Sequence, residues 1–204
     1  MTIPDYGPAV LLQMFEIAFP LFLIMDPIAN SATCLAILKE FSPVRQRRII
    51  FRELAIALGI IIMFHFLGEG LLTLLGIQQS TLRVAGGVIL FIISMRLVFP
   101  APEENVVPGG DPFFVPIATP FIAGPSLLAA VMVYSRREEG GMVVLGAILI
   151  AWLGSLGVML AAPSLQRVLG KRGIRAAERL MGLILILLSV QMLEDGVRMF
   201  LGEL

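Results

Sequence analysis

The stretch of residues 19–37, FPLFLIMDPIANSATCLAI, most strongly limits what this chain can fold into. It is apolar enough to lie in the hydrocarbon of a bilayer, yet Asp26 and Pro27 stand near its middle. Proline cannot continue a helical hydrogen-bond ladder, and a carboxylate at bilayer depth is energetically costly. Broken membrane helices persist where their freed backbone groups face protein or a cavity, and such places typically hold a solute or ion. The alternative is an ordinary kinked helix that Asp26 caps.

Composition supports a membrane location for the rest of the chain. Of the 204 residues, 58% are hydrophobic, whereas a soluble domain has roughly 45–50%. The formal net charge of zero gives no reason to expect a nucleic-acid partner. A single cysteine, Cys34, excludes an intrachain disulfide, and a single histidine, His65, leaves no histidine cluster for a metal. We therefore expect a polytopic membrane protein without a metal or cofactor.

Apolar segments recur along the chain and predict an all-α fold with six transmembrane helices. A long polar linker at residues 101–110 separates a first three-helix unit, 1–100, from a second, 111–204. The fourth segment contains Pro116, Pro120 and Gly124-Pro125, so it predicts a second broken helix. The predicted helices cover residues 10–38, 49–67, 82–99, 113–135, 142–161 and 176–193.

The two units resemble each other in the order of their motifs. Three pairs correspond: Asp26-Pro27 with Gly124-Pro125, Leu75-Gly76 with Leu169-Gly170, and Arg83-x-x-Gly86 with Arg179-x-x-Gly182. Because three helices are an odd number, a second copy enters the membrane in the opposite direction. The expected architecture is therefore an inverted 3+3 repeat in which the first helix of each half is broken near the midplane. Gly86, Gly87 and Gly182 are expected to permit close helix packing.

The positions of the basic residues predict the orientation in the membrane. If the N-terminus lies outside, eleven of the 15 Lys and Arg residues fall on the inner side, including the run from Arg45 to Arg52. Only Arg83, Arg136, Arg137 and Arg198 remain outside. The positive-inside rule then assigns both termini to the outer face of the membrane.

Several motifs in combination resemble the MarC family of bacterial and archaeal inner-membrane proteins. They are DPIAN at 26–30, LRVAGG at 82–87, RLVFP at 96–100, VPIATP at 115–120, AGP at 123–125 and RLMG at 179–182. The resemblance covers essentially the whole chain. It implies an inner-membrane location and, by similarity to SnatA-type members, transport of a small neutral amino acid such as glycine or alanine, with proton coupling as one mode. The chain departs from the family pattern at Ala29, Ala32 and Ser126. The methyl and hydroxyl groups of these residues would change the size of the substrate pocket.

The candidate substrate site lies where the two broken helices restart. Half-helices that begin at Pro27 and Pro125 direct unpaired N–H groups toward the midplane, where a substrate carboxylate is a natural partner. Asp26 is the candidate acceptor for the substrate ammonium. The other candidate substrate-binding residues are Asn30, Ser31, Thr119, Ala123, Gly124 and Ser126. The alternative for the hydroxyl groups is local bonding to the preceding helical turn.

Three residues are candidate proton carriers: Asp26, His65 and Glu53. Burial favours a neutral Asp26, whereas the helix start and a bound ammonium favour the carboxylate, so substrate occupancy can change its protonation. A permanently ionised cap is the alternative for Asp26. For His65 the alternative is a packed or interface-facing side chain, and for Glu53 it is an ion pair with Arg52 or another basic neighbour.

A secondary transporter is the leading hypothesis, with a small-molecule amino acid and the lipid bilayer as its partners. An enzyme is not expected, because Ser126 and His65 form the only available nucleophile and base. A non-transporting membrane scaffold or regulator is the other alternative, although matched midplane breaks would then have no purpose. Nothing in the sequence specifies an oligomeric state.

Overall fold

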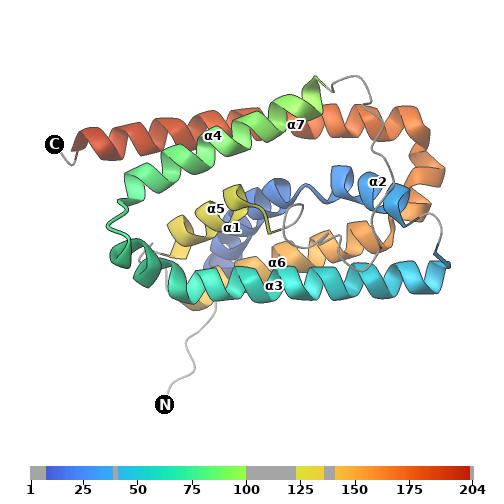
Figure 1. Cartoon of the computed structure of the whole chain (residues 1–204), viewed down its shortest axis with the longest axis horizontal. Coiled ribbons are helices and arrows are strands. Elements are labelled where there is room, and N and C mark those ends of the chain that lie inside the picture. Colours follow the sequence, from blue (N-terminus) through green and yellow to red (C-terminus); the bar gives the residue numbers. More distant parts are fainter. Residues whose placement is uncertain (1–7, 39–40, 100–122, 136–140, 203–204) are drawn as a thin grey trace, which may run out of the picture.

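A computed structural model describes residues 8–38, 41–99, 123–135 and 141–202, and within these ranges the regular structure is entirely helical. Figure 1 shows the arrangement of these helices. In chain order they are α1 (Pro8–Met25), α2 (Pro27–Ile37), α3 (Pro43–Leu74), α4 (Gln79–Val98), α5 (Pro125–Ser135), α6 (Gly141–Leu160) and α7 (Ala162–Gly202).

Long helices enclose the short ones. α4 lies along α7 on one side of the molecule, and α3 lies beside α6 on the other (Figure 1). Between these pairs lie α1, α2 and α5, with α5 touching α3 and α4 and α2 touching α6 and α7. The helices that begin or end at the two predicted breaks therefore occupy the middle of the molecule.

Four helical stretches are long and apolar enough to cross a membrane. They are Pro43–Leu74, Gln79–Val98, Gly141–Leu160 and Arg172–Gly202, and two shorter apolar helices, Val10–Met25 and Pro125–Ser135, accompany them. Of the predicted fourth segment, 113–135, the structure describes residues 123–135. The part that contains Pro116 and Pro120 lies outside the described residues, so six complete spans stay a prediction.

Two helices begin earlier than predicted: α3 begins at residue 43 rather than 49, and α7 at residue 162 rather than 176. Residues 43–48 form the first turns of α3, because Pro43 stands at the start of the helix, where a missing N–H costs nothing. Likewise, residues 162–169 form the first turns of α7. Gly76 and Gly170, which the motif alignment pairs, have φ values of 63° and 62°. A positive φ lets the chain change direction sharply, and residues other than glycine rarely adopt it.

Glycines bring α4 and α7 into close contact, as predicted. A Cβ atom added at Gly182 would lie 2.9 Å from the Leu97 Cβ and 3.2 Å from the Ser94 backbone oxygen. One added at Gly87 would lie 3.0 Å from the Ser189 backbone oxygen. All three distances are shorter than ordinary Cβ contacts, so the glycines set how closely the two helices approach.

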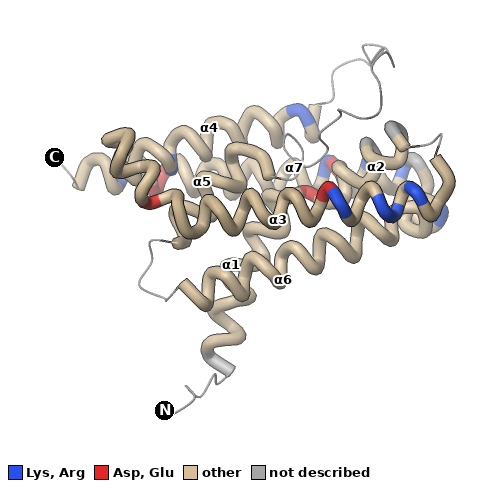
Figure 2. The backbone as a smooth tube through the Cα atoms, turned by 60° about the horizontal axis from the view of Figure 1, so that its bottom comes forward, with Lys and Arg blue, Asp and Glu red and all other residues tan. Residues whose placement is uncertain are grey.

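Basic side chains gather at one end of the bundle. Figure 2 shows Lys and Arg concentrated where α3 begins and where α7 bends near Gly170. The opposite end carries Arg83 and Arg198, each paired with an acidic residue of α7. The charge asymmetry used for the predicted orientation is therefore also an asymmetry in three dimensions.

Candidate functional site

The first break has the position that the sequence predicts. α1 ends at Met25, α2 begins at Pro27, and Asp26 between them has φ 42° and ψ 59°. Among the described residues, Asp26 is the only non-glycine residue with a positive φ. Aspartate tolerates this left-handed conformation better than most residues, although glycine would adopt it without strain. The chain nevertheless has a carboxylate at this position instead of glycine.

Local hydrogen bonds satisfy the backbone around the break. The Asp26 N–H donates to the Leu23 carbonyl at 3.0 Å, and the Asn30 amide donates to the Met25 carbonyl at 2.7 Å. Ser31 donates its hydroxyl to the Ile28 carbonyl at 2.7 Å. Ser31 thus bonds locally, as the alternative for the hydroxyl groups anticipated. The Asn30 side chain satisfies the Met25 carbonyl, because the Ala29 N–H that would bond it in a continuous helix donates to Asp26 Oδ1 instead.

Asp26 is buried without strong partners. The residue is 7% exposed, and its Oδ1 accepts a bond of 3.4 Å from the Ala29 N–H. The charge of Glu178 on α7 also acts unfavourably on the Asp26 carboxylate, because α2 packs against α7. The sequence does not connect Glu178 with Asp26, since 152 positions separate them in the chain. The first break therefore buries a carboxyl group that has one long hydrogen bond.

The second helix start also has its predicted position. α5 begins at Pro125, and the Gly124 carbonyl accepts the first helical bond from the Leu128 N–H at 3.1 Å. Ala123 and Ser126 are 2% and 4% exposed, whereas Pro125 is exposed. Ala123 belongs to the same buried cluster as Met25. Thr119 lies outside the described residues.

His65 is packed between helices rather than placed beside Ser126. Its Nδ1 lies 2.7 Å from the Ser135 hydroxyl, which donates its own proton to the Val131 carbonyl at 2.7 Å. In this arrangement His65 Nδ1 carries the proton and donates it to Ser135. Ser126 lies nine residues earlier on α5, roughly 13 Å along the helix axis. The Ser126–His65 pair considered for an enzyme is therefore not formed.

Glu53 forms the ion pair with Arg52 that was considered for it. Its Oε1 lies 2.7 Å from Arg52 Nη2 and accepts a second bond from Nε at 3.1 Å. The Glu53 side chain is 7% exposed and the Arg52 side chain 62%.

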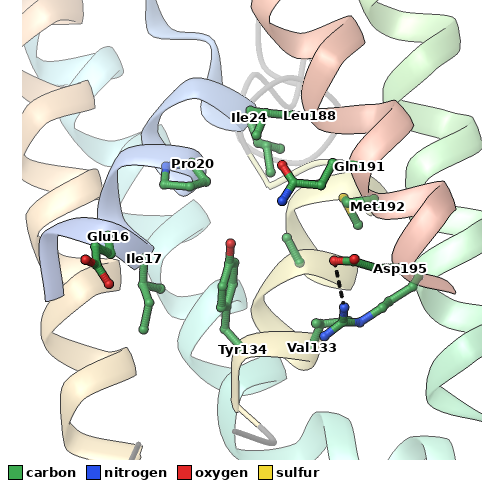
Figure 3. Close-up of a pocket in the computed structure, with 12 residues that line it drawn as sticks. Glu16, Ile17, Pro20, Ile24, Val133, Tyr134, Leu188, Gln191, Met192 and Asp195 are labelled. Carbon is green, nitrogen blue, oxygen red and sulfur yellow. Dashed lines mark hydrogen bonds and ion pairs between the residues drawn. The ribbon is translucent and has the colours of Figure 1, made fainter. Parts of the chain in front are cut away.

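A cavity of about 280 Å³ lies between α1, α4, α5 and α7. Figure 3 shows the Tyr134 hydroxyl and the Gln191 amide pointing into the same space, with Glu16 on one side and Asp195 on the other. Arg83 Nη1 donates to Asp195 Oδ2 at 3.1 Å. The lining residues are Glu16, Ile17, Pro20, Ile24, Arg83, Ala130, Val133, Tyr134, Leu188, Gln191, Met192 and Asp195.

Sequence analysis missed this cavity, because its polar residues come from four separate helices. One signal was available: Glu16 stands inside the first apolar segment and Gln191 inside the last, where polar residues are uncommon. The cavity borders the first break through Ile24, two positions before Asp26, and reaches α5 through Ala130. Across the described ranges, no three His, Cys, Asp or Glu side chains gather in a way that could hold a metal ion.

These features define a class: a multi-pass helical membrane protein with a broken helix and a small polar cavity beside the break. The family model described as "MarC family integral membrane protein" matches residues 11–201. The chain therefore belongs to the MarC family, as its motifs suggested.

Related proteins occur in several bacteria. An inner membrane protein of Escherichia coli K12, "UPF0056 inner membrane protein YhgN", is 40% identical over 195 residues, which cover 93% of this chain and 98% of the relative. A "UPF0056 membrane protein" of Buchnera aphidicola is 41% identical and covers 91% and 96%. A Chlamydia pneumoniae relative is 32% identical and covers 92% and 95%. No solved structure matches the chain. The relatives support a multi-pass protein of the inner membrane.

Proposed function

We propose that this protein is a secondary transporter of small neutral amino acids, with Asp26 as the residue that couples transport to protons. The observation that carries the proposal is the break at Asp26. A buried carboxylate occupies a strained backbone position, in a membrane protein, with one long hydrogen bond. Such an arrangement costs free energy in the folded state, and function is the usual reason for its retention.

The chemistry of the site suits an amino-acid zwitterion. The first N–H groups of α2 and α5 lack helical acceptors, and the positive ends of these helix dipoles favour a substrate carboxylate. Asp26 accepts the ammonium group. When the substrate leaves, Asp26 takes up a proton, because an unpaired carboxylate buried in a membrane interior is unfavourable. Proton movement is thereby linked to substrate movement.

The proposal includes the inverted 3+3 repeat and six membrane spans. Its support is the paired positions of Gly76 and Gly170, which both have a positive φ, and the paired helix starts at Pro27 and Pro125. In this architecture the restarts at Pro27 and Pro125 come from opposite sides of the membrane. Alternating access then follows from the movement of one repeat against the other.

Uptake by proteoliposomes tests the proposed activity. Purified protein is reconstituted, and labelled glycine or alanine is offered with and without a pH gradient. We expect accumulation above the external concentration with the gradient, and exchange alone without it. Leucine, arginine and glutamate serve as larger or charged competitors. Absence of both accumulation and exchange for glycine and alanine would contradict the proposal.

The proposed orientation, with both termini outside, is testable at the two ends of α3. Ser42 and Gln78 are exposed residues just before α3 and α4, and neither makes a side-chain capping bond. In a Cys34→Ala background, Gln78→Cys should react with an impermeant thiol reagent in intact cells, and Ser42→Cys should react only after permeabilisation. The reverse pattern would invert the orientation.

A further inference from the structure

The cavity beside the first break combines charges of both signs in a small volume. Glu16 comes from α1, Arg83 from α4 and Asp195 from α7. At about 280 Å³, it has room for about nine water molecules at ~30 Å³ each. This volume is near the lower end of ligand pockets, so the cavity suits a small solute.

Arg83 is the most informative residue of the cavity. Its side chain is 13% exposed and pairs with Asp195, whose side chain is 41% exposed. Among the described residues, its Nε is the only buried side-chain nitrogen or oxygen without a hydrogen-bond partner. A buried donor without an acceptor is unfavourable, and a carboxylate is the acceptor that a guanidinium fits best. Because this Nε has almost no accessible surface, a ligand in the cavity reaches the guanidinium through its other nitrogens.

Glu16 and the uncharged residues complete the arrangement. Glu16 is an exposed residue that forms no ion pair within the described part of the chain, and it lies across the cavity from Asp195 (Figure 3). Tyr134 and Gln191 supply polar groups between the two sides. Ile17, Val133 and Leu188 supply apolar walls. A ligand with an ammonium at one end, a carboxylate at the other and a small apolar group matches these walls.

We propose that this cavity is a second binding site for the transported amino acid, outward of the site at Asp26. The substrate carboxylate binds Arg83, partly replacing Asp195, and the substrate ammonium binds Glu16. The choice of an amino acid as ligand rests on the proposed function. The Arg83–Asp195 pair therefore opens when substrate enters and closes when the cavity is empty.

Thiol labelling inside the cavity tests this site without requiring transport. Gln191→Cys in a Cys34→Ala background gives the purified protein one reactive cysteine, and the rate of modification by a small methanethiosulfonate reagent is measured. Glycine and alanine should slow the reaction at concentrations where propionate and ethylamine, which each carry only one charged group, do not. Equal protection by propionate or ethylamine would overturn the zwitterion assignment.

Charge variants identify the groups that bind. In the same background, Arg83→Gln or Glu16→Gln should raise the glycine concentration for half protection about tenfold, as expected for the loss of a charge-assisted bond. Arg83→Lys should restore part of the protection. Arg198→Gln is the matched control, because this exposed arginine pairs with Glu194 at the same end of the molecule and does not line the cavity. If Arg83→Gln fails to fold, the Glu16→Gln variant alone tests the assignment of the binding groups, because it leaves the Arg83–Asp195 pair intact.

The outcomes separate this inference from the proposed function. Protection by glycine without transport by the wild-type protein supports the cavity site and contradicts the transporter. Transport of glycine without any protection at Gln191→Cys overturns the cavity site and leaves the transporter standing. Protection that Arg83→Gln and Glu16→Gln leave unchanged also overturns the assignment. Absence of both protection and transport overturns both.

Discussion

The interface between α4 and α7 and the break between α1 and α2 are built from different groups. At the α4–α7 interface, glycines allow close approach, and the buried hydroxyls of Ser94 and Ser189 donate to carbonyls of their own helices at 2.9 and 2.6 Å. At the break, a buried carboxylate adopts a left-handed conformation and makes one long bond. Apart from the Arg83–Asp195 pair at one end, the first region has the features of a stable contact, whereas the second retains an unfavourable group. The glycine contacts of α4 and α7 and the proposed site at Asp26 thus lie in different parts of the fold.

The largest effect is expected from Asp26→Asn. Asparagine also tolerates the left-handed conformation and can cap a helix, so the fold should persist while the titratable charge is lost. Gradient-driven accumulation of glycine should fall more than tenfold, with exchange retained. Glu194→Gln, which removes an exposed carboxylate of α7, is the control. If Asp26→Asn still accumulates glycine, Asp26 is a structural cap, and the break differs from the α4–α7 interface in structure alone.

Gly182→Ala should produce the largest loss of stability. The added methyl group would lie 2.9 Å from Leu97 Cβ and Val98 Cγ2, and such overpacking costs ~1–3 kcal/mol. Gly59→Ala is the matched control, because an added Cβ on that α3 glycine meets no atom within 4 Å. Thermal unfolding in detergent should show a lower Tm for Gly182→Ala alone. Equal Tm values for the two variants would remove the special role of the α4–α7 interface.

Asn30→Ala tests what stabilises the break. It removes the donor that bonds the Met25 carbonyl at 2.7 Å, and an unsatisfied buried carbonyl costs ~1–3 kcal/mol. For a chain of this length, each kcal/mol lowers Tm by about 2–4 °C. Ser31→Ala, whose hydroxyl bonds a carbonyl within its own helix, should have a smaller effect. A larger loss for Ser31→Ala would assign the stabilisation of the break to Ser31.

The smallest effect is expected from Ser135→Ala. This change removes the hydroxyl that joins His65 of α3 to α5, at a cost of about 1 kcal/mol. Transport should stay near the wild-type rate, since Ser135 gives its proton to a backbone carbonyl and is not activated as a nucleophile. A loss of activity with unchanged Tm would reopen the possibility of chemistry at His65.

The sequence determined the local features of the chain because they depend on residue type and nearest neighbours. Proline lacks an N–H, so Pro27 and Pro125 mark helix starts regardless of the surroundings. The membrane class follows from hydrophobic content, and the tight glycine contacts follow from the absence of a side chain. The pairing of Glu53 with adjacent Arg52 and the packing of His65 were likewise within reach of sequence analysis.

Tertiary structure alone decided which distant side chains meet. The charge of Glu178 acts on Asp26 because α2 packs on α7. Ser135 rather than Ser126 meets His65 because of where α5 crosses α3. The cavity arises from helices that are far apart in the chain, and its Arg83–Asp195 pair joins residues 112 positions apart. Helix periodicity specifies which residues share a face, but the partner of that face depends on the simultaneous packing of all the helices.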